Sequence, residues 1–314
     1  MAVATGFTEL AGCRVPIQQA PMGSVSTSAL AVAVADAGGV GSITTLGMTA
    51  AELDQVLAGM TARTAGILAA NFLTGGIDPE AVAAAAARVR IVDFFWADPD
   101  PALVEVAHRG RALACWQVGS LEEALAAADA GCDVVVVQGT EAGGHVRGRS
   151  PLRPLLDSVL GRVEVPVLAA GGIGDARAFA AVLAAGAAGA RVGTRFVAAS
   201  ESGAHPLYKQ AVTEAAAGST EITGAFSVCP LCATVPRARV LRSCVTALGD
   251  LAGEVVGETT AGGRRITLPR GHGLPPGAAA TGHIEAMPMY AGESAAHVGA
   301  VEPAARIIRS WTGG

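Results

Sequence analysis

The chain has 314 residues, enough for one large barrel or two ordinary domains with a sizeable core. Hydrophobic residues make up 51% of it, but charged residues such as Asp36 and Arg191 break every long apolar run, and the N-terminus around Glu9 does not resemble an export signal. We therefore predict a cytoplasmic protein with no membrane span. The formal net charge is −5 without a basic block, so we expect no nucleic-acid partner.

Short apolar runs alternate with alanine-rich segments of helical length along the first two thirds of the chain. The runs are continuously apolar, as expected for strands that are covered on both faces. Strands are predicted, in chain order, at 15–21, 40–43, 66–72, 91–96, 112–118, 133–139, 165–172 and 189–196. Helices are predicted between them, for example at 26–38, 50–60, 120–131 and 175–186. This alternation predicts an α/β fold, a closed (β/α)8 TIM barrel.

The competing architecture is a doubly wound Rossmann sheet, whose fingerprint places three spaced glycines after the first strand. The nearest match runs from Gly172 to Arg177, and it follows the seventh predicted strand. Arg177 stands where the third glycine should be. The sequence therefore favours the barrel.

The alternation of strands and helices stops after the eighth strand. We assign the barrel to residues 1–216 and predict a small irregular insertion, or lid, at 217–285, which is rich in Gly, Pro and Arg. Residues 286–314 are expected to close the fold, with a C-terminal helix packed on the barrel.

Six cysteines in a chain this long do not form a disulfide framework, and we expect reduced thiols. Cys229 and Cys232 have the spacing of half a zinc site, but no second pair follows them. Cys244 and His272 could complete a set only with unusual spacing. We therefore expect no metal, and we expect His272 to be a surface residue of a loop.

Small and polar residues gather at the predicted C-terminal ends of the strands, where a barrel carries its active site. Glycines there let the backbone approach an anion and turn N–H groups toward it, and a helix beginning near Asp175 adds its positive end. Any one glycine pair could be an ordinary tight turn, but two such loops in succession favour a phosphate site. The residues at these ends are Gln19, Ala20, Pro21, Met22, Asn71, Gln138, Gly171, Gly172, Gly193 and Thr194.

His145 follows two glycines in the loop after the sixth predicted strand, within VVVVQGTEAGGH. An imidazole titrates near neutral pH and suits a general base. The alternative is a surface histidine or a core histidine with satisfied hydrogen bonds. Glu141, in the same loop, could orient the imidazole or could be an ordinary loop residue.

The stretches PIQQAPM, VVVVQGTEAGGHVRG, VPVLAAGGIGDARAFAAVLAAGAAGARVGTRF and ESGAHPLYKQA resemble the nitronate monooxygenase family, formerly called 2-nitropropane dioxygenases. The resemblance covers most of 15–212, with further similarity near the C-terminus. It implies a TIM barrel that binds FMN without a covalent link and oxidises alkyl nitronates with molecular oxygen to a carbonyl compound and nitrite. It also implies His145 as the catalytic base. The implied FMN-binding residues are Ala20, Pro21, Met22, Asn71, Gln138 and Gly143 near the flavin, and Gly171, Gly172, Gly193 and Thr194 at the phosphate.

The chain departs from the family after the fourth strand, where members tend to have a glycine and a proline. This substrate-side loop instead contains Trp96, Asp98 and Asp100, so the sequence leaves the identity of the substrate open. Met289 and Tyr290 could cover the flavin or could belong to the core.

Two other functions fit the same motifs. A relative on the same scaffold would be an NAD(P)H-dependent FMN reductase that acts on a quinone or an enoyl thioester, and it would share the Gly-Gly-His motif. A non-catalytic FMN-binding protein is the third hypothesis. The expected partners are a small-molecule substrate and molecular oxygen, and assembly into a homo-oligomer is left open.

Overall fold

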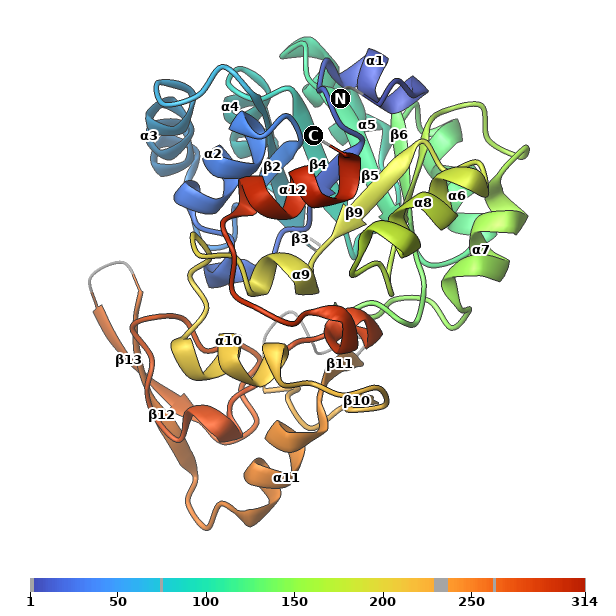
Figure 1. Ribbon diagram of the computed structural model, residues 1–314. Helices are drawn as coiled ribbons and strands as arrows, with labels where there is room; N and C mark the ends of the chain where they lie inside the picture. Colours follow the sequence, from blue (N-terminus) through green and yellow to red (C-terminus); the bar gives the residue numbers. More distant parts are fainter. Residues whose placement is uncertain (1–2, 74–75, 229–236, 262–263, 314) are drawn as a thin grey trace.

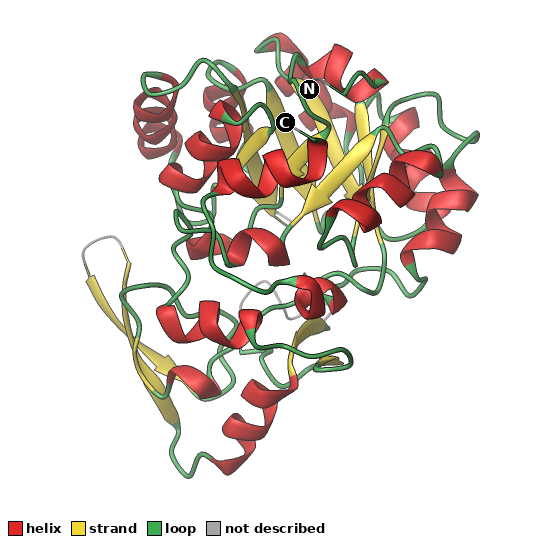
Figure 2. Cartoon of the chain, in the orientation of Figure 1, coloured by secondary structure: helices red, strands yellow, loops and turns green. Residues whose placement is uncertain are grey.

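The structure, a computed structural model, describes residues 3–73, 76–228, 237–261 and 264–313. Eight parallel strands of the described chain close into a barrel that helices cover on the outside (Figures 1 and 2). The circle closes where the last strand pairs with the first, with Ala190 opposite Ile17. This confirms the predicted TIM barrel and leaves no open edge for a Rossmann sheet. In order around the barrel the strands are β1 (Ile17–Gln19), β2 (Val40–Thr44), β3 (Ile67–Leu73), β4 (Ile91–Phe95), β5 (Leu113–Val118), β6 (Val134–Gln138), β8 (Val167–Ala170) and β9 (Gly189–Val192).

The outer helices begin at side chains that accept hydrogen bonds from their first backbone N–H groups. Thr49 and Glu52 form a capping box, and Asp100 caps a helix whose first residue is Pro101. These caps fix where alanine-rich segments start. The helices are α2 (Ser28–Asp36), α3 (Ala50–Thr61), α4 (Pro79–Ala86), α5 (Pro101–Arg109), α6 (Leu121–Asp129), α7 (Leu152–Val159) and α8 (Ala176–Ala184), and α12 (Ala304–Thr312) packs beside α2 and α8.

The eighth predicted strand is too long at its C-terminal end. The sequence pattern extends it to residue 196, but β9 ends at Val192 and α9 (Thr194–Val197) follows as a single helical turn. The backbone N–H of Phe196 donates to the carbonyl of Gly193, so the chain already turns at the rim of the barrel.

The barrel interior is apolar at one end and polar at the other. The short helix α1 (Gly6–Ala11) places Phe7 against Ile91 and Leu168, which closes the N-terminal end of the barrel with a buried apolar cluster. Towards the C-terminal ends of the strands the interior side chains become polar. This polarity gradient puts the functional end of the barrel opposite α1.

A smaller lobe lies against that functional end (Figure 1). It has a hydrophobic core of its own, around Tyr208, Val240 and Met287. Because Tyr208 belongs to this core, the lobe begins before residue 217. Its elements are α10 (Pro206–Thr213), β10 (Thr220–Thr223), β11 (Ala238–Leu241), α11 (Arg242–Asp250), β12 (Val255–Ala261), β13 (Arg264–Pro269), β14 (Thr281–Gly282), η2 (Ile284–Ala286) and η3 (Glu293–His297).

Two sequence-based expectations for this region need correction. The described part of 217–285 is not irregular, because it contains a helix and strands of two three-stranded sheets; its frequent Gly and Pro residues separate short elements instead of marking one long loop. His272 is not a surface residue: it is 3% exposed, and burial lowers the pKa of its imidazole to about 4. Cys229 and Cys232 lie outside the described residues.

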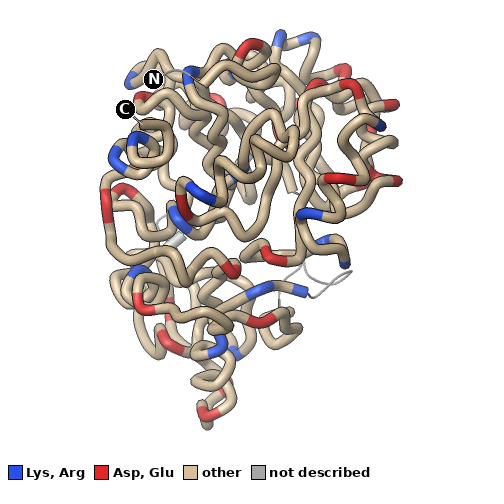
Figure 3. Tube along the Cα trace, turned by 45° about the vertical axis from the view of Figure 1, so that its right-hand side comes forward, with Lys and Arg blue, Asp and Glu red and all other residues tan. Residues whose placement is uncertain are grey.

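Basic and acidic residues are interspersed over the barrel and the smaller lobe (Figure 3). Among the described residues, no helix is both long enough and apolar enough to cross a membrane.

One buried ion pair crosses the polar end of the barrel interior. Nη2 of Arg191 lies 2.7 Å from Oδ1 of Asp93, and both side chains are almost fully buried. Arg191 also donates to Oε1 of Gln117 at 2.7 Å and to Oε1 of Gln18 at 3.1 Å. Removing one partner of such a pair leaves an uncompensated buried charge.

We therefore expect Asp93→Asn, which keeps the shape and removes the charge, to lower the free energy of unfolding by roughly 3–5 kcal/mol. Chemical denaturation would measure this loss. The control is Asp54→Asn, which breaks the ion pair of Asp54 and Arg88 on the surface and should cost much less. Equal losses in the two variants would contradict a structural role for the buried pair.

Candidate active site

One cavity lies between the C-terminal ends of the barrel strands and the smaller lobe. Its wall brings together residues from strands far apart in sequence, together with Tyr208, Leu274 and Tyr290 from the lobe. Every residue that the sequence analysis assigned to the base or the cofactor lines this one cavity: Ala20, Pro21, Met22, Asn71, Gln138, Gly143, His145, Gly171, Gly172, Gly193 and Thr194.

Asn71 lies at the end of β3 and is completely buried. Its Nδ2 donates to Oδ2 of Asp93 at 2.9 Å, so the buried ion pair below determines which way the amide points. Oδ1 of Asn71 is buried and accepts no hydrogen bond from the described residues. A buried carbonyl oxygen without a donor is costly, and here it belongs to a residue of the cavity wall, so it fits a ligand with an N–H or O–H group.

The loops after β8 and β9 form a side of the cavity with little side-chain bulk. Gly171 and Gly172 have φ angles of +118° and +71°, which other residues rarely adopt. A Cβ on Gly171 would lie 3.0 Å from the backbone N of Ala142. Thr194 accepts from the N–H of Gly292 at 2.9 Å, which leaves its hydroxyl hydrogen available to a ligand. This side suits a group that needs close backbone approach, such as a phosphate.

The backbone of His145 is held by the smaller lobe. Gly144 and His145 form the two-residue strand β7, which pairs antiparallel with β11, with His145 opposite Ala238. At Gly143 an added Cβ would lie 2.5 Å from the backbone N of Gly292, so the lobe itself requires a glycine there. Gly143 therefore serves the contact between barrel and lobe, whereas Gly144 has open space beside it and a φ angle of +77° that favours glycine.

The imidazole of His145 lies between two aromatic rings. Its centroid is 5.6 Å from that of Trp96, nearly edge-on, and 5.7 Å from that of Tyr290. Burial lowers the pKa of His145 below its ordinary value. The neutral imidazole therefore predominates near neutral pH, the form in which it can accept a proton.

Glu141 and Gln138 arrange the loop that carries His145. Both carboxylate oxygens of Glu141 accept from the backbone N–H of Leu152, at 2.8 and 3.0 Å, so Glu141 caps α7. Gln138 donates through Nε2 to the carbonyl of His145 at 2.9 Å and accepts at Oε1 from the N–H of Arg147 at 3.2 Å. Gln138 lines the cavity and also fixes the backbone on both sides of the histidine.

Sequence reasoning missed several residues of the wall, or left their place open. Tyr290 lines the cavity, whereas its neighbour Met289 is buried in the core of the lobe. In the sequence, Arg191 was noted only as a charge that interrupts an apolar run. A charged residue within a predicted barrel strand could have indicated that the interior of the barrel is polar there. No sequence pattern indicated that Leu274 and Tyr208 line the cavity, because their positions depend on how the smaller lobe packs against the barrel.

Comparison with known proteins identifies the family to which the chain belongs. The model of the nitronate monooxygenase family matches residues 5–75 and 69–313. A nitronate monooxygenase from Pseudomonas aeruginosa is 34% identical over 269 residues, which cover 70% of this chain and 77% of that protein. A 5-hydroxy-7a-methyl-1-oxo-octahydro-1H-indene-4-carboxyl-CoA dehydrogenase from Rhodococcus jostii is 36% identical over 200 residues, and the match spans 63% of this chain and only 56% of that relative.

Two solved structures share the fold over almost the whole chain. FabK from Thermotoga maritima has 26% sequence identity and a TM-score of 0.79, covering 99% of this chain and 96% of that one. A nitroalkane oxidase from Streptomyces ansochromogenes has 28% identity and a TM-score of 0.76, covering 98% and 97%. With a family model that matches almost the entire chain, the protein belongs to the nitronate monooxygenase family of oxidoreductases.

Proposed function

We propose that the protein binds FMN in this cavity and oxidises alkyl nitronates with molecular oxygen to a carbonyl compound and nitrite, with His145 as the catalytic base. The observation that carries the proposal is the convergence on one cavity of a half-buried, neutral histidine and a glycine-lined wall. The similarity to a nitronate monooxygenase and to a nitroalkane oxidase supports it.

The residues of the cavity fit FMN at both ends of the molecule. Oδ1 of Asn71 would accept from a donor of the flavin or its ribityl chain, and Gly171, Gly172 and Gly193 would leave space for the phosphate. The hydroxyl of Thr194 would donate to a phosphate oxygen. When bound, FMN supplies the redox chemistry, taking electrons from the substrate and passing them to oxygen.

The charges of the wall suit an anion. Among the described residues that line the cavity there is no aspartate or glutamate, and the guanidinium of Arg191 at its base is paired with Asp93 below the wall. A phosphate and a nitronate are both anions, so neither meets a carboxylate in the wall. Trp96 and Tyr290 flank the imidazole of His145, which can take the Cα proton of a neutral nitroalkane.

A second function is an FMN-dependent reductase that takes electrons from NAD(P)H and acts on a quinone or an enoyl thioester. The similarity to FabK favours it, and so does the similarity to a carboxyl-CoA dehydrogenase. Because His145 and the glycine loops serve either chemistry, the electron donor separates the two functions.

The phosphate assignment is tested best at Gly193, where φ is −109° and an added Cβ would meet only ordinary contacts, the nearest 3.5 Å away. We expect Gly193→Asp to weaken FMN binding by at least about tenfold relative to Gly193→Asn, because two charges about 4 Å apart repel by roughly 4 kcal/mol at an effective dielectric constant of about 20. Titration of the flavin-free protein with FMN measures both constants. Equal affinities in the Asp and Asn variants would place the phosphate elsewhere.

The role of His145 is tested by comparing two forms of one substrate. We expect His145→Ala to slow turnover of a neutral nitroalkane by roughly 10²–10⁴-fold, the usual contribution of a general base. Turnover of the pre-formed nitronate should fall much less, because that form has already lost its proton. Steady-state kinetics at matched flavin content measure both, and equal losses would mean that His145 only positions the substrate.

The pH dependence follows from the half-buried imidazole of His145. The base must be neutral, so kcat/KM for a nitroalkane that stays neutral over the range should rise with pH and then level off. Because burial lowers the pKa of His145 from 6.5, the midpoint of this rise should lie below pH 6.5. A midpoint at or above pH 6.5 in the wild type, or the same rise in His145→Ala, would contradict the assignment.

A further inference from the structure

The loop after β4 holds a large residue in a strained backbone conformation. Trp96 has a φ angle of +77°, and Arg111 is the only other described non-glycine residue with a positive φ. This conformation is unfavourable for a bulky side chain and persists only where the surroundings hold it. Trp96 is also 8% exposed and lines the cavity, so the strain is located at the site itself.

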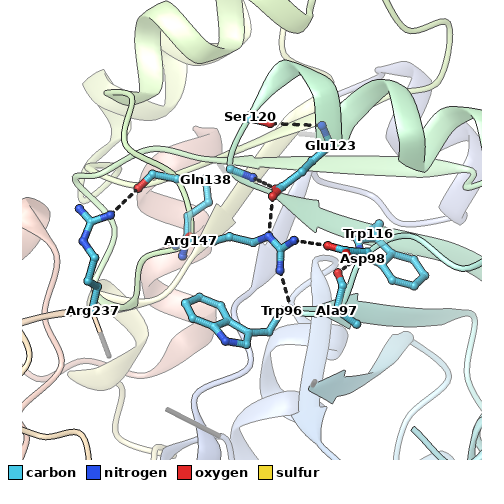
Figure 4. Close-up of polar contacts among 11 residues, drawn as sticks. Trp96, Ala97, Asp98, Trp116, Ser120, Glu123, Gln138, Arg147 and Arg237 are labelled. Atoms are coloured by element: carbon cyan, nitrogen blue, oxygen red, sulfur yellow. Dashed lines mark hydrogen bonds and ion pairs between the residues drawn. The ribbon is translucent and has the colours of Figure 1, made fainter. Parts of the chain in front are cut away.

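The guanidinium of Arg147 holds this loop from the other side (Figure 4). Its Nη1 donates to the carbonyl of Trp96 at 2.5 Å, and its Nε bonds to Oε1 of Glu123 at 2.7 Å. Its Nη2 reaches Asp98 at 2.6 Å, although that carboxylate is 92% exposed and contributes little. The indole of Trp116 donates to the carbonyl of Ala97 at 3.1 Å. The carbonyls of Trp96 and Ala97 are thus held by the partly buried Arg147 and the buried Trp116.

Arg147 also belongs to the loop of the histidine. It follows His145 by two residues, and its backbone N–H bonds to the amide of Gln138 that also holds the carbonyl of His145. One residue therefore connects the backbone of the base with the backbone of Trp96, and the indole lies nearly edge-on to the imidazole. The space beside the base is filled by an indole whose position depends on Arg147.

We propose that Trp96 is a specificity-determining residue that limits the substrate to short-chain nitronates and nitroalkanes, and that Arg147 is the positioning residue that keeps the indole in place. The substrate class rests on the proposed function. A flat side chain packed against the imidazole leaves room beside the reacting carbon for a small group and closes the space that a long acyl chain would need.

The test uses straight-chain carboxylates, which resemble alkyl nitronates in shape and charge but do not react. Calorimetry on the flavin-loaded protein gives the ratio of the dissociation constants of octanoate and propanoate. The wild type should bind propanoate more tightly. Trp96→Gly should lower the ratio by at least about tenfold, since one methylene in a closed pocket is worth roughly 10- to 200-fold. Glycine adopts a φ of +77° without strain, so this variant should fold, and Trp96→Phe should keep most of the wild-type preference.

Arg147→Met tests the positioning role through a double-mutant comparison. It should lower the octanoate-to-propanoate ratio in the wild-type background and leave the ratio unchanged in Trp96→Gly, because no indole remains to be placed. Arg153→Met removes an arginine from an exposed helical ion pair and should leave the ratio as in the wild type. An Arg147→Met effect of equal size in both backgrounds would overturn the positioning role.

Two further outcomes would overturn the role of Trp96. One is a wild type that binds neither carboxylate or binds both equally, and the other is an unchanged ratio in Trp96→Gly. Because binding needs no turnover, these results are separate from the proposed function. A protein that does not oxidise nitronates but shows the predicted ratios would contradict the proposed function, while supporting the selection of short chains by Trp96 and its positioning by Arg147.

Discussion

The antiparallel pairing of β7 with β11 is the interaction on which the site depends. It joins the loop after the sixth barrel strand to the smaller lobe and places His145 opposite Ala238. The side chain of Arg239 strengthens the contact, because its Nε donates to the carbonyl of Thr140 at 2.8 Å. Gly143 is needed because the backbone of the lobe passes directly beside it. The barrel supplies the histidine, and the lobe supplies the edge that holds its backbone.

The wall of the cavity that contains Asn71 is held in place by side chains inside the barrel. Arg191 holds Asp93, and Asp93 holds the amide of Asn71, so the orientation of a cavity residue follows from a charge buried below it. The cavity thus has a base set by buried electrostatics and a cover set by packing of the lobe. A rigid base suits the precise placement of a cofactor, whereas the cover consists of side chains such as Tyr290 from the lobe and Trp96 from the barrel loop after β4.

The barrel could be predicted because its signals are local. Buried parallel strands appear as continuous apolar runs, and the topology then sends the end of each strand to one rim, so the sequence alone was enough to group Asn71, Gln138 and His145 there. The lobe could not be predicted, because its strands are short and its core joins segments that are far apart in the sequence, such as Tyr208 and Met287. For the same reason His272 was expected on the surface and is buried. The strained φ of Trp96 depends on a side chain from another loop, and no pattern near Trp96 indicates it.

The central functional claim is that the protein carries FMN and that a nitronate is its electron donor. The most direct measurement is the visible absorption spectrum of the purified protein under anaerobic conditions, recorded after addition of an alkyl nitronate and, separately, of NADH or NADPH. We expect a yellow protein whose flavin absorption is bleached by the nitronate and returns when oxygen is admitted, with little change on addition of either nicotinamide. Bleaching by NADH or NADPH but not by the nitronate would make the protein a reductase, and a colourless protein that cannot be reconstituted with FMN would contradict both functions.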